Sequence, residues 1–161
     1  PYRILPALLR RLLAHGFGRA VLVMPEELGR RLTAQPGGDD YGKLTVQVAL
    51  RAKCKVLFPL MRSDFDPPPN VASVVAHVLP KAPPASLDWA LLDAVLDTAW
   101  AAKRRTLRHS LAPLAEQLPV PPQVVAQALE EGAARDRTAP EVAPWEWAKL
   151  TLALARLRAG G

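Results

Sequence analysis

The sequence contains a single cysteine, Cys54, and only 6% of its residues are aromatic. One cysteine excludes an internal disulfide and any zinc site built from several cysteines, and it fits a reducing intracellular compartment. No apolar run approaches the roughly 20 residues that span a membrane. Half of the residues are hydrophobic, so the core must consist mainly of Ala, Leu and Val. The three histidines share no metal-ligand spacing, and neither a P-loop nor a nucleophile–base pair is visible.

Positive charge exceeds negative charge by six, and the excess is unevenly distributed. The first 82 residues carry 12 basic and 6 acidic side chains, whereas the remainder carries nine of each. Within that balanced part, Lys103, Arg104, Arg105 and Arg108 are grouped with no acidic residue among them. A basic cluster of this kind favours a polyanionic partner, although the ordinary role of a charge run is a solvated helix face.

The proline-rich segment at residues 80–84 divides the chain into two parts. Before it, strand and helix patterns alternate, and after it every pattern is helical. Strands are expected at 19–24, 55–61 and 72–79, and helices at 4–15, 26–34, 41–52, 106–117, 122–131 and 144–158. Ser86 is a plausible cap for a further helix that contains Trp89 and Leu92. The sequence therefore predicts an α/β fold, with residues 1–82 as the late half of a doubly wound sheet and residues 83–161 as a small helical domain.

Three further side chains have ordinary structural interpretations. His77 lies in an apolar strand pattern, where a hydrogen-bonded structural histidine is expected. Trp145 and Trp147 are expected to pack the terminal helix, although an exposed one could contact RNA or a ribosomal protein.

Phe65 stands just before three consecutive prolines, Pro67, Pro68 and Pro69, and a β-branched run follows them. Each proline fixes its own φ and extends the residue before it. The backbone that carries Phe65 is therefore stiff, and its ring loses little entropy when it packs against a flat partner. Taken alone, this pattern favours a buried phenylalanine at a proline-rich strand entry.

Two long runs and one short one resemble a known family. The run at residues 63–75, S-D-F-D-P-P-P-N-V-A-S-V-V, resembles the segment S-A-F-x-P-P-P-K-V-D-S-A-V of the small-subunit rRNA adenine dimethyltransferases, the KsgA-like family. The run at residues 100–111, W-A-A-K-R-R-T-L-R-H-S-L, resembles that family's F-N-Q-R-R-K-T-I-R-N-S-L. Pro1-Tyr2 resembles the last half of N-[LI]-P-[YF], the catalytic loop of adenine-amine methyltransferases. Because the family's S-adenosylmethionine loop precedes that motif, the chain is expected to be the carboxy-terminal part of such a protein.

The resemblance implies an S-adenosylmethionine-dependent rRNA adenine N6,N6-dimethyltransferase, with most cofactor-binding residues outside this chain. The carbonyl of Pro1 would accept a hydrogen bond from the adenine amine, and Tyr2 and Phe65 would stack on the two faces of the base. Without the resemblance, Tyr2 is an ordinary turn residue. The basic run would contact rRNA phosphates from one helix face on which Arg104 and Arg108 lie one turn apart. Its members are Lys103, Arg104, Arg105, Arg108 and His109.

The implied partners are small-subunit rRNA and the ribosomal proteins of an assembling subunit, in the cytoplasm or the mitochondrial matrix, with no metal and no membrane. Several positions depart from the family pattern. Asn70 replaces Lys, Ala72 replaces Asp, Pro25 replaces Gln, and Ala101-Ala102 replace Asn-Gln. The loss of these polar side chains affects catalysis more than RNA binding. The alternative is therefore a non-catalytic assembly factor or a mitochondrial transcription-factor relative. The related large-subunit rRNA methyltransferases are a third interpretation, because they resemble this chain around Phe65. They lack a segment like the basic run, which argues against them.

Overall fold

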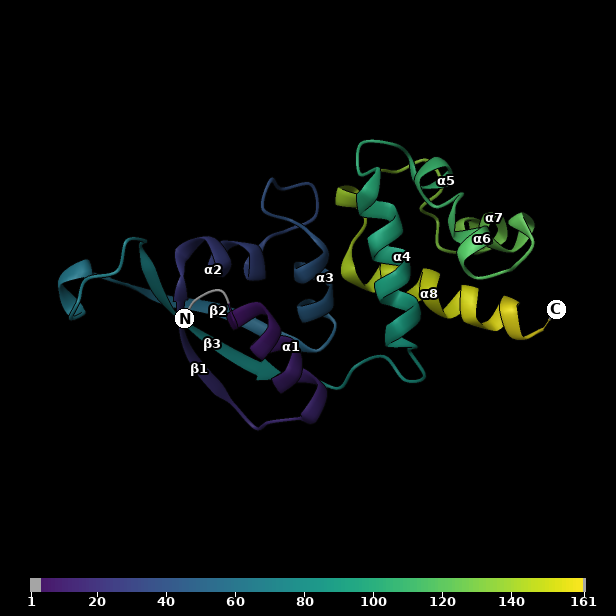
Figure 1. Cartoon of the computed structure of the whole chain (residues 1–161). Coiled ribbons are helices and arrows are strands. Elements are labelled where there is room, and N and C mark those ends of the chain that lie inside the picture. Colours follow the sequence, from purple (N-terminus) through teal and green to yellow (C-terminus); the bar gives the residue numbers. More distant parts are fainter. Residues whose placement is uncertain (1–3, 161) are drawn as a thin grey trace.

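The computed structural model describes residues 4–160, and its elements follow the predicted order (Figure 1). The first half contains α1 (Leu5–His15), β1 (Ala20–Pro25), α2 (Glu26–Thr33), α3 (Lys43–Ala49), β2 (Ala52–Leu60) and β3 (Ser73–Pro80). The second half contains α4 (Trp89–Ala101), α5 (Leu107–Ser110), α6 (Leu114–Gln117), α7 (Pro122–Glu131) and α8 (Pro144–Ala159). The predicted class, α/β followed by helices, is confirmed. The helix expected at 41–52 is shorter, because Ala52 already belongs to β2.

The three strands form one sheet in the order β1-β3-β2, with β3 antiparallel to both neighbours. The expected hairpin between β2 and β3 is confirmed, and a register shift between Val56 and Phe58 bends β2 where it approaches the connecting loop. On its other side β3 pairs with β1, from Ala20 opposite Val78 to Pro25 opposite Ser73. These pairings bring the carboxyl ends of β1 and β2 and the start of β3 to the same end of the sheet.

Helices α1, α2 and α3 supply the apolar cover of one face of this sheet. The buried cluster comprises Leu9, Met24, Leu28, Leu32, Val48, Ala52, Val74, Ala76 and Val78. A glycine in α2, Gly29, permits close approach, since a Cβ added there would lie 2.9 Å from Cγ2 of Val74. The alternate positions of β1 face the other way, where Val21 is 60% and Val23 41% exposed.

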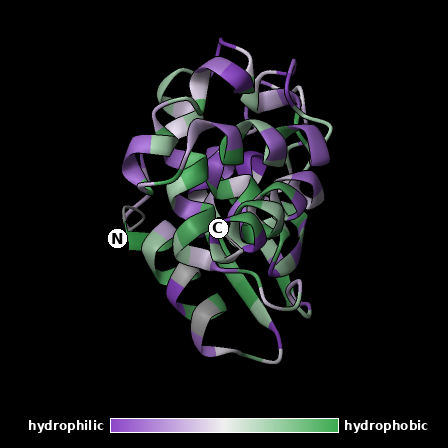
Figure 2. Ribbon diagram, turned by 90° about the vertical axis from the view of Figure 1, so that its right-hand side faces the viewer, coloured by the Kyte–Doolittle hydropathy of each residue, from purple (hydrophilic) through white to green (hydrophobic). Residues whose placement is uncertain are grey.

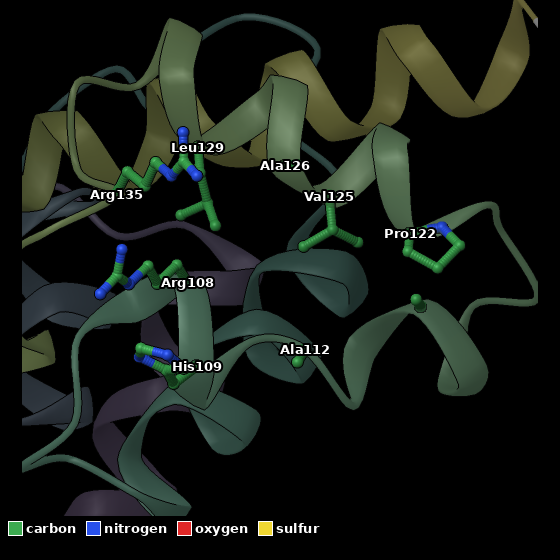
Figure 3. Close-up of a pocket in the computed structure, with 9 residues that line it drawn as sticks. Arg108, His109, Ala112, Pro122, Val125, Ala126, Leu129 and Arg135 are labelled. Carbon is green, nitrogen blue, oxygen red and sulfur yellow. The ribbon is translucent and has the colours of Figure 1, made fainter.

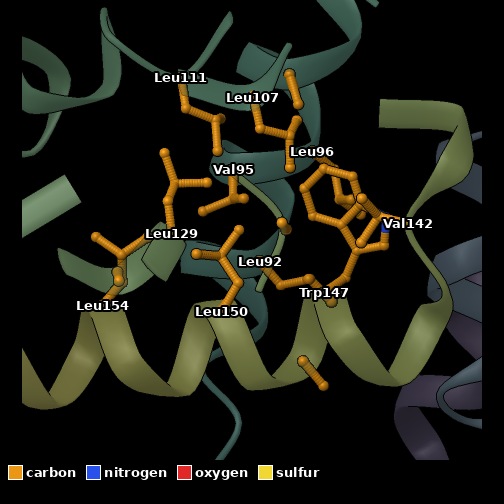
Figure 4. Close-up of a cluster of buried hydrophobic side chains, with 14 of the residues drawn as sticks. Leu92, Val95, Leu96, Leu107, Leu111, Leu129, Val142, Trp147, Leu150 and Leu154 are labelled. Atoms are coloured by element: carbon orange, nitrogen blue, oxygen red, sulfur yellow. The ribbon is translucent and has the colours of Figure 1, made fainter. Parts of the chain in front are cut away.

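The second half packs around a second apolar centre, in which α8 lies against α4 and α7 (Figure 4). Trp147 of α8 is completely buried there, together with Leu92 and Leu96 of α4. The expectation that the terminal tryptophans pack the last helix is therefore confirmed for Trp147 and wrong for Trp145, which is 65% exposed. In the ribbon coloured by hydropathy, hydrophilic segments lie mostly toward the outside of the molecule (Figure 2).

Asp88, rather than Ser86, caps the first helix of this half. The Asp88 side chain accepts hydrogen bonds of 3.0 Å from the backbone N–H groups of Ala90 and Leu91. Ser86 lies two residues earlier with a positive φ of 61°, a conformation that a helix N-cap does not adopt. The prediction was wrong because both residues are good caps and the sequence pattern does not decide which of them enters the turn.

The helix expected at 106–117, with the basic run on its face, is divided. The backbone leaves α4 at Ala102, and the segment 102–105 forms a turn. Thr106 then pairs with Thr138 in an isolated β-bridge, after which α5 lasts only four residues. Pro113 is the N-cap of α6, and a proline disfavours helical geometry in the residue before it. Arg104 and Arg108 therefore do not lie one turn apart on a common helix.

The two halves share a core across the predicted boundary at residue 82. Tyr41, together with Val46 and Leu50 of the first half, belongs to the same buried cluster as Trp147. The rings of Tyr41 and Trp100 have centroids 6.4 Å apart, and those of Trp100 and Trp147 lie 5.4 Å apart. The division at residue 82 thus follows the change in secondary structure, while α3 packs against the helical half.

Candidate functional site

Phe65 lies in the loop 61–72 that joins β2 to β3, here called the Phe65 loop. The loop projects from the end of the sheet that is remote from the helical half (Figure 1). Phe65 follows a short 3-10 turn (Arg62–Asp64) and has extended backbone angles, φ −127° and ψ 145°. Its side chain is half-buried, so one part of it packs against the protein and another part faces outward. Such a ring can act as a stacking platform.

Three hydrogen bonds brace the Phe65 loop. The backbone N–H of Met61 donates to Oδ2 of Asp64 at 2.7 Å, and Nε of Arg62 donates to the carbonyl of Pro69 at 2.9 Å. The N–H of Glu26, the first residue of α2, donates to the carbonyl of Ala72 at 2.9 Å. These bonds, together with the prolines, give the loop a defined shape before any partner arrives. Asp64 therefore has a structural role beside Phe65.

An apolar rim surrounds the base of this loop, and the sequence analysis did not identify it. Met61 is 68% exposed, Phe58 52% and Val71 46%. The signal was available, because the run from Val56 to Met61 is almost wholly apolar although only one face of a strand is needed for the core. Exposed apolar groups beside a stiff aromatic ring are suited to contact with a flat, partly apolar ligand.

Pro1 and Tyr2, the other predicted catalytic residues, lie outside the described residues. Within residues 4–160, no glycine-rich loop follows a strand, because β1 passes through Pro25 directly into α2 and β2 leads into the proline loop. The described residues therefore do not provide the kind of backbone cradle in which a nucleotide-like methyl donor is usually held, and we assign none of them to S-adenosylmethionine.

The basic residues 103–109, here called the cationic segment, form a turn and the short helix α5. Lys103, Arg104 and Arg105 are exposed, and no ion pair to them is seen in the part of the chain that the structure describes. Arg108 has a long contact of 3.6 Å with Asp136, whose side chain is 74% exposed. Nδ1 of His109 lies 2.9 Å from Oγ1 of Thr106, which holds the imidazole beside the helix. Because a turn precedes the short helix α5, these cations do not lie along one face of a single helix.

A pocket of about 490 Å³ opens beside the cationic segment (Figure 3). Arg108 and His109 line one side, and Val125 and Leu129 of α7 line the other. Arg135, from the segment after α7, completes the rim and forms an ion pair of 2.9 Å with Glu130. The pocket therefore combines apolar walls with a cationic rim.

Arg135 was missed by the sequence analysis because only tertiary structure brings it to the cationic segment. The backbone carbonyl of Arg135 accepts a hydrogen bond of 3.1 Å from the N–H of Arg108, and that of Arg137 accepts one of 2.8 Å from Leu107. These bonds fix the two segments side by side. No local pattern in the sequence signals this pairing.

The structure does not bring the two predicted groups together. The Phe65 loop projects at one end of the molecule, and the cationic segment lies in the helical half, where the chain turns from α4 into α5 (Figure 1). Contact between these groups and a single partner therefore requires a partner that extends along the molecule.

Other kinds of site find no support in residues 4–160. No group of three or more potential metal ligands is present there, and no helix is long and apolar enough to span a membrane. Burial raises the pKa of the Cys54 thiol to about 11, so this thiol is unreactive near neutral pH. His77 is half-buried in β3, and its Nε2 has no hydrogen-bond partner among the described residues. The expectation of a fully bonded histidine is wrong for that atom.

Comparison with known proteins identifies the family. The profile of the ribosomal RNA adenine dimethylase family matches residues 1–131. The chain belongs to this family.

Named relatives agree with this assignment. The chain is 32% identical over 166 residues to the ribosomal RNA small subunit methyltransferase A of Prochlorococcus marinus, a match that covers 97% of the chain and 58% of that protein. It is 38% identical over 109 residues to a probable dimethyladenosine transferase of Caenorhabditis elegans, covering 66% and 35%. The chain thus spans between about a third and three fifths of the length of these relatives.

Two solved structures have a similar fold. A dimethyladenosine transferase from Plasmodium falciparum matches with a TM-score of 0.88 at 24% identity, over 98% of this chain and 65% of that one. The 23S rRNA methyltransferase ErmE matches with a TM-score of 0.60 at 23% identity, over 96% and 62%. At these identities the likeness concerns the fold, and the fold is more similar to that of the dimethyladenosine transferase.

Proposed function

We propose that this chain works in the S-adenosylmethionine-dependent dimethylation of adenine amines in small-subunit rRNA, on an assembling subunit. The observation that carries the proposal is the family match over residues 1–131, which includes Pro1-Tyr2, the Phe65 loop and the cationic segment. The cytoplasm and the mitochondrial matrix both contain ribosomes, and either would supply this substrate. S-adenosylmethionine would provide an electrophilic methyl group, bound mainly by residues outside this chain.

The adenine amine is a poor nucleophile because its lone pair is delocalised into the ring. In the proposal, the Pro1 carbonyl accepts a hydrogen bond from this amine, while Tyr2 and Phe65 hold the two faces of the extracted base. Stacking of this kind contributes about 1–3 kcal/mol per base. The bracing of the Phe65 loop by Arg62 and Asp64 supports this role, because a ring that is already positioned loses less entropy when the base binds.

The cationic segment would bind rRNA phosphates in the helical half, away from the Phe65 loop. Lys103, Arg104 and Arg105 are exposed and available, and Arg108 has only a long, exposed ion pair to exchange. Phosphate contacts fix the position of a protein on RNA without reading its sequence. His109 lies beside these cations and would contact the same rRNA backbone.

Methyl transfer to immature small subunits tests the catalytic part of the proposal. The complete protein that contains this chain should transfer methyl groups, Phe65→Ala in it should reduce the rate by at least tenfold, and Phe65→Tyr should retain most of the rate because a stacking ring is kept. Equal rates for Phe65→Ala and wild type would remove Phe65 from the site.

RNA binding as a function of salt tests the cationic segment. Replacing one phosphate-binding arginine, in Arg104→Gln or Arg105→Gln, should reduce the slope of log K against log salt by about 0.7–0.9. The matched control is Arg158→Gln, an equal change of charge near the end of α8. A slope that changes equally in the control would mean that only net charge matters.

A non-catalytic assembly factor is the second candidate. It is favoured by the departures at Pro25, Asn70 and Ala72, which remove polar groups near the Phe65 loop. Ala72 lies next to the strand junction, where its carbonyl binds the N–H of Glu26. An intact protein that binds immature subunits and transfers no methyl group would favour this candidate.

A further inference from the structure

Two neighbouring hollows lie at the junction between the α/β half and the helical half. The first, of about 700 Å³, is lined by Lys53 and Lys55 of β2, by Lys81 and by Pro144 at the start of α8. The second, of about 510 Å³, is lined by Lys81, Leu50, Trp145 and Lys149. Both are lined by Lys81, and Pro144 and Trp145 are consecutive residues, so the two hollows adjoin, and together they are here called the junction groove.

The junction groove is positively charged. Its four lysines are all exposed, and no acidic residue lines either hollow. None of the four takes part in an ion pair with another described residue. Lysines on an exposed edge strand such as β2 protect against edge-to-edge pairing, which accounts for Lys53 and Lys55. It does not account for Lys81 or Lys149, which lie outside that strand.

Trp145 provides a flat apolar surface in the same groove. It is 65% exposed, whereas its neighbour Trp147 is completely buried. Leu50, 4% exposed, and Ala148, 3% exposed, form a floor beside it. Lys149 follows Trp145 by one turn of α8, so both side chains lie on the same side of the helix. An exposed indole beside exposed lysines is suited to a ligand that carries both aromatic rings and negative charge.

We infer that the junction groove binds a single-stranded segment of RNA, with phosphates at Lys81 and Lys149 and an unstacked base on Trp145. A base inside a duplex has no free face for the indole, whereas a base in a single strand has one. The inference rests on the proposed function and adds a third contact to it, formed by residues of both halves.

The test is binding of a fluorescein-labelled, single-stranded RNA of 12 nucleotides to the full chain, measured over a range of salt concentrations. Trp145→Ala should weaken binding by about five- to 150-fold with no change in the salt slope, and Trp145→Phe should restore most of the affinity. The double variant Lys81→Gln/Lys149→Gln should reduce the slope by about 1.4, since each phosphate contact in single-stranded RNA contributes about 0.7. The matched control is Arg19→Gln/Arg158→Gln, which removes the same charge outside the groove.

The outcomes separate this inference from the proposed function. One outcome would contradict RNA binding in the junction groove: the lysine double variant and its control weaken binding equally, and Trp145→Ala has no effect. This outcome would not affect the proposed role of the cationic segment. A second outcome would also overturn the inference: poly-glutamate competes with the labelled RNA as strongly as unlabelled RNA does, and Trp145→Ala has no effect. The partner of the groove would then be an acidic protein and not RNA. Absence of RNA binding by the wild-type chain would contradict the proposed function as well.

Discussion

The hydroxyl of Tyr41 donates a hydrogen bond of 2.7 Å to the backbone carbonyl of Val142, and this bond joins the α/β half to the helical half. Both residues are buried, with Tyr41 5% exposed. Burial raises the pKa of Tyr41 well above its usual value, so the hydroxyl remains a donor throughout the physiological pH range. The relative position of the two halves thus depends on a buried polar contact inside an apolar cluster.

Removal of this hydroxyl in Tyr41→Phe should lower the free energy of unfolding by about 1–3 kcal/mol, because the carbonyl of Val142 would be left buried without its partner. Urea denaturation measures the change, and the exposed substitution Trp145→Phe is the control. An unchanged denaturation midpoint would mean that water or another group replaces the hydroxyl.

Gly29→Ala should destabilise the protein by about 1–3 kcal/mol, the usual range for overpacking. The new Cβ would lie 2.9 Å from Cγ2 of Val74 and 3.2 Å from Cγ2 of Val56, so α2 would have to move away from the sheet. Gly18→Ala is the matched control, since a Cβ at Gly18 meets nothing within 4 Å. The double variant Gly29→Ala/Val74→Ala should lose less stability than the two single changes together, and strict additivity would argue against the clash.

Glu146 should make stability sensitive to acid. Burial alone would raise the pKa of this carboxyl, but Arg137, which donates at 2.6 Å, and the N–H of Ala143, which donates at 2.7 Å, lower it below its ordinary value of 4.5. The folded state therefore binds fewer protons than the unfolded state just below pH 4.5. The stabilisation is complete above that value and is lost as the pH falls through the lowered pKa.

Glu146→Gln tests this coupling, with Glu116→Gln at an exposed position as the control. The Glu146 variant should lose about 1 kcal/mol at pH 7, since Arg137 is partly exposed, and its stability should fall less steeply between pH 5 and about pH 3. Denaturant titrations at several pH values give both quantities. Parallel pH profiles for wild type and Glu146→Gln would contradict the assignment.

Arg62→Ala should loosen the Phe65 loop while leaving the fold intact. The bond from Nε of Arg62 to the carbonyl of Pro69 would be lost, although both groups are near the surface. Under the proposed function, the methyl-transfer rate should fall by about 10- to 100-fold, as is typical when a positioning contact is removed. Arg19→Ala is the control for the lost charge. A normal rate combined with faster proteolysis of residues 61–72 would show that the loop orders itself around the base without help from Arg62.

The sequence predicted those parts of the fold that depend on neighbouring residues. The β-branched run at Val74-Val75 and the prolines before it were sufficient for the hairpin of β2 and β3, and the change from strands to helices at the proline-rich segment 80–84 was visible in composition. The insertion of β3 between β1 and β2 could not be read from local patterns, because it depends on a pairing between residues as distant as Ala20 and Val78.

The prediction of the cationic segment as one helix face was wrong for a similar reason. Apolar spacing continues from Trp100 through Leu107 to Leu111, and each of these side chains does pack against the core. The backbone between them nevertheless turns, since Thr106 pairs with Thr138. Such a bridge outweighs helical periodicity and is invisible in either segment alone. Arg135, which this pairing brings to the pocket, was invisible for the same reason.

The separation of the Phe65 loop from the cationic segment restricts the size of any RNA that engages both. An RNA that contacts only one of the two groups would leave the other in solvent. A large folded rRNA could present a nucleotide to the aromatic platform while a distant backbone rests on the arginines. Recognition would then depend on the distance between two features of the folded RNA.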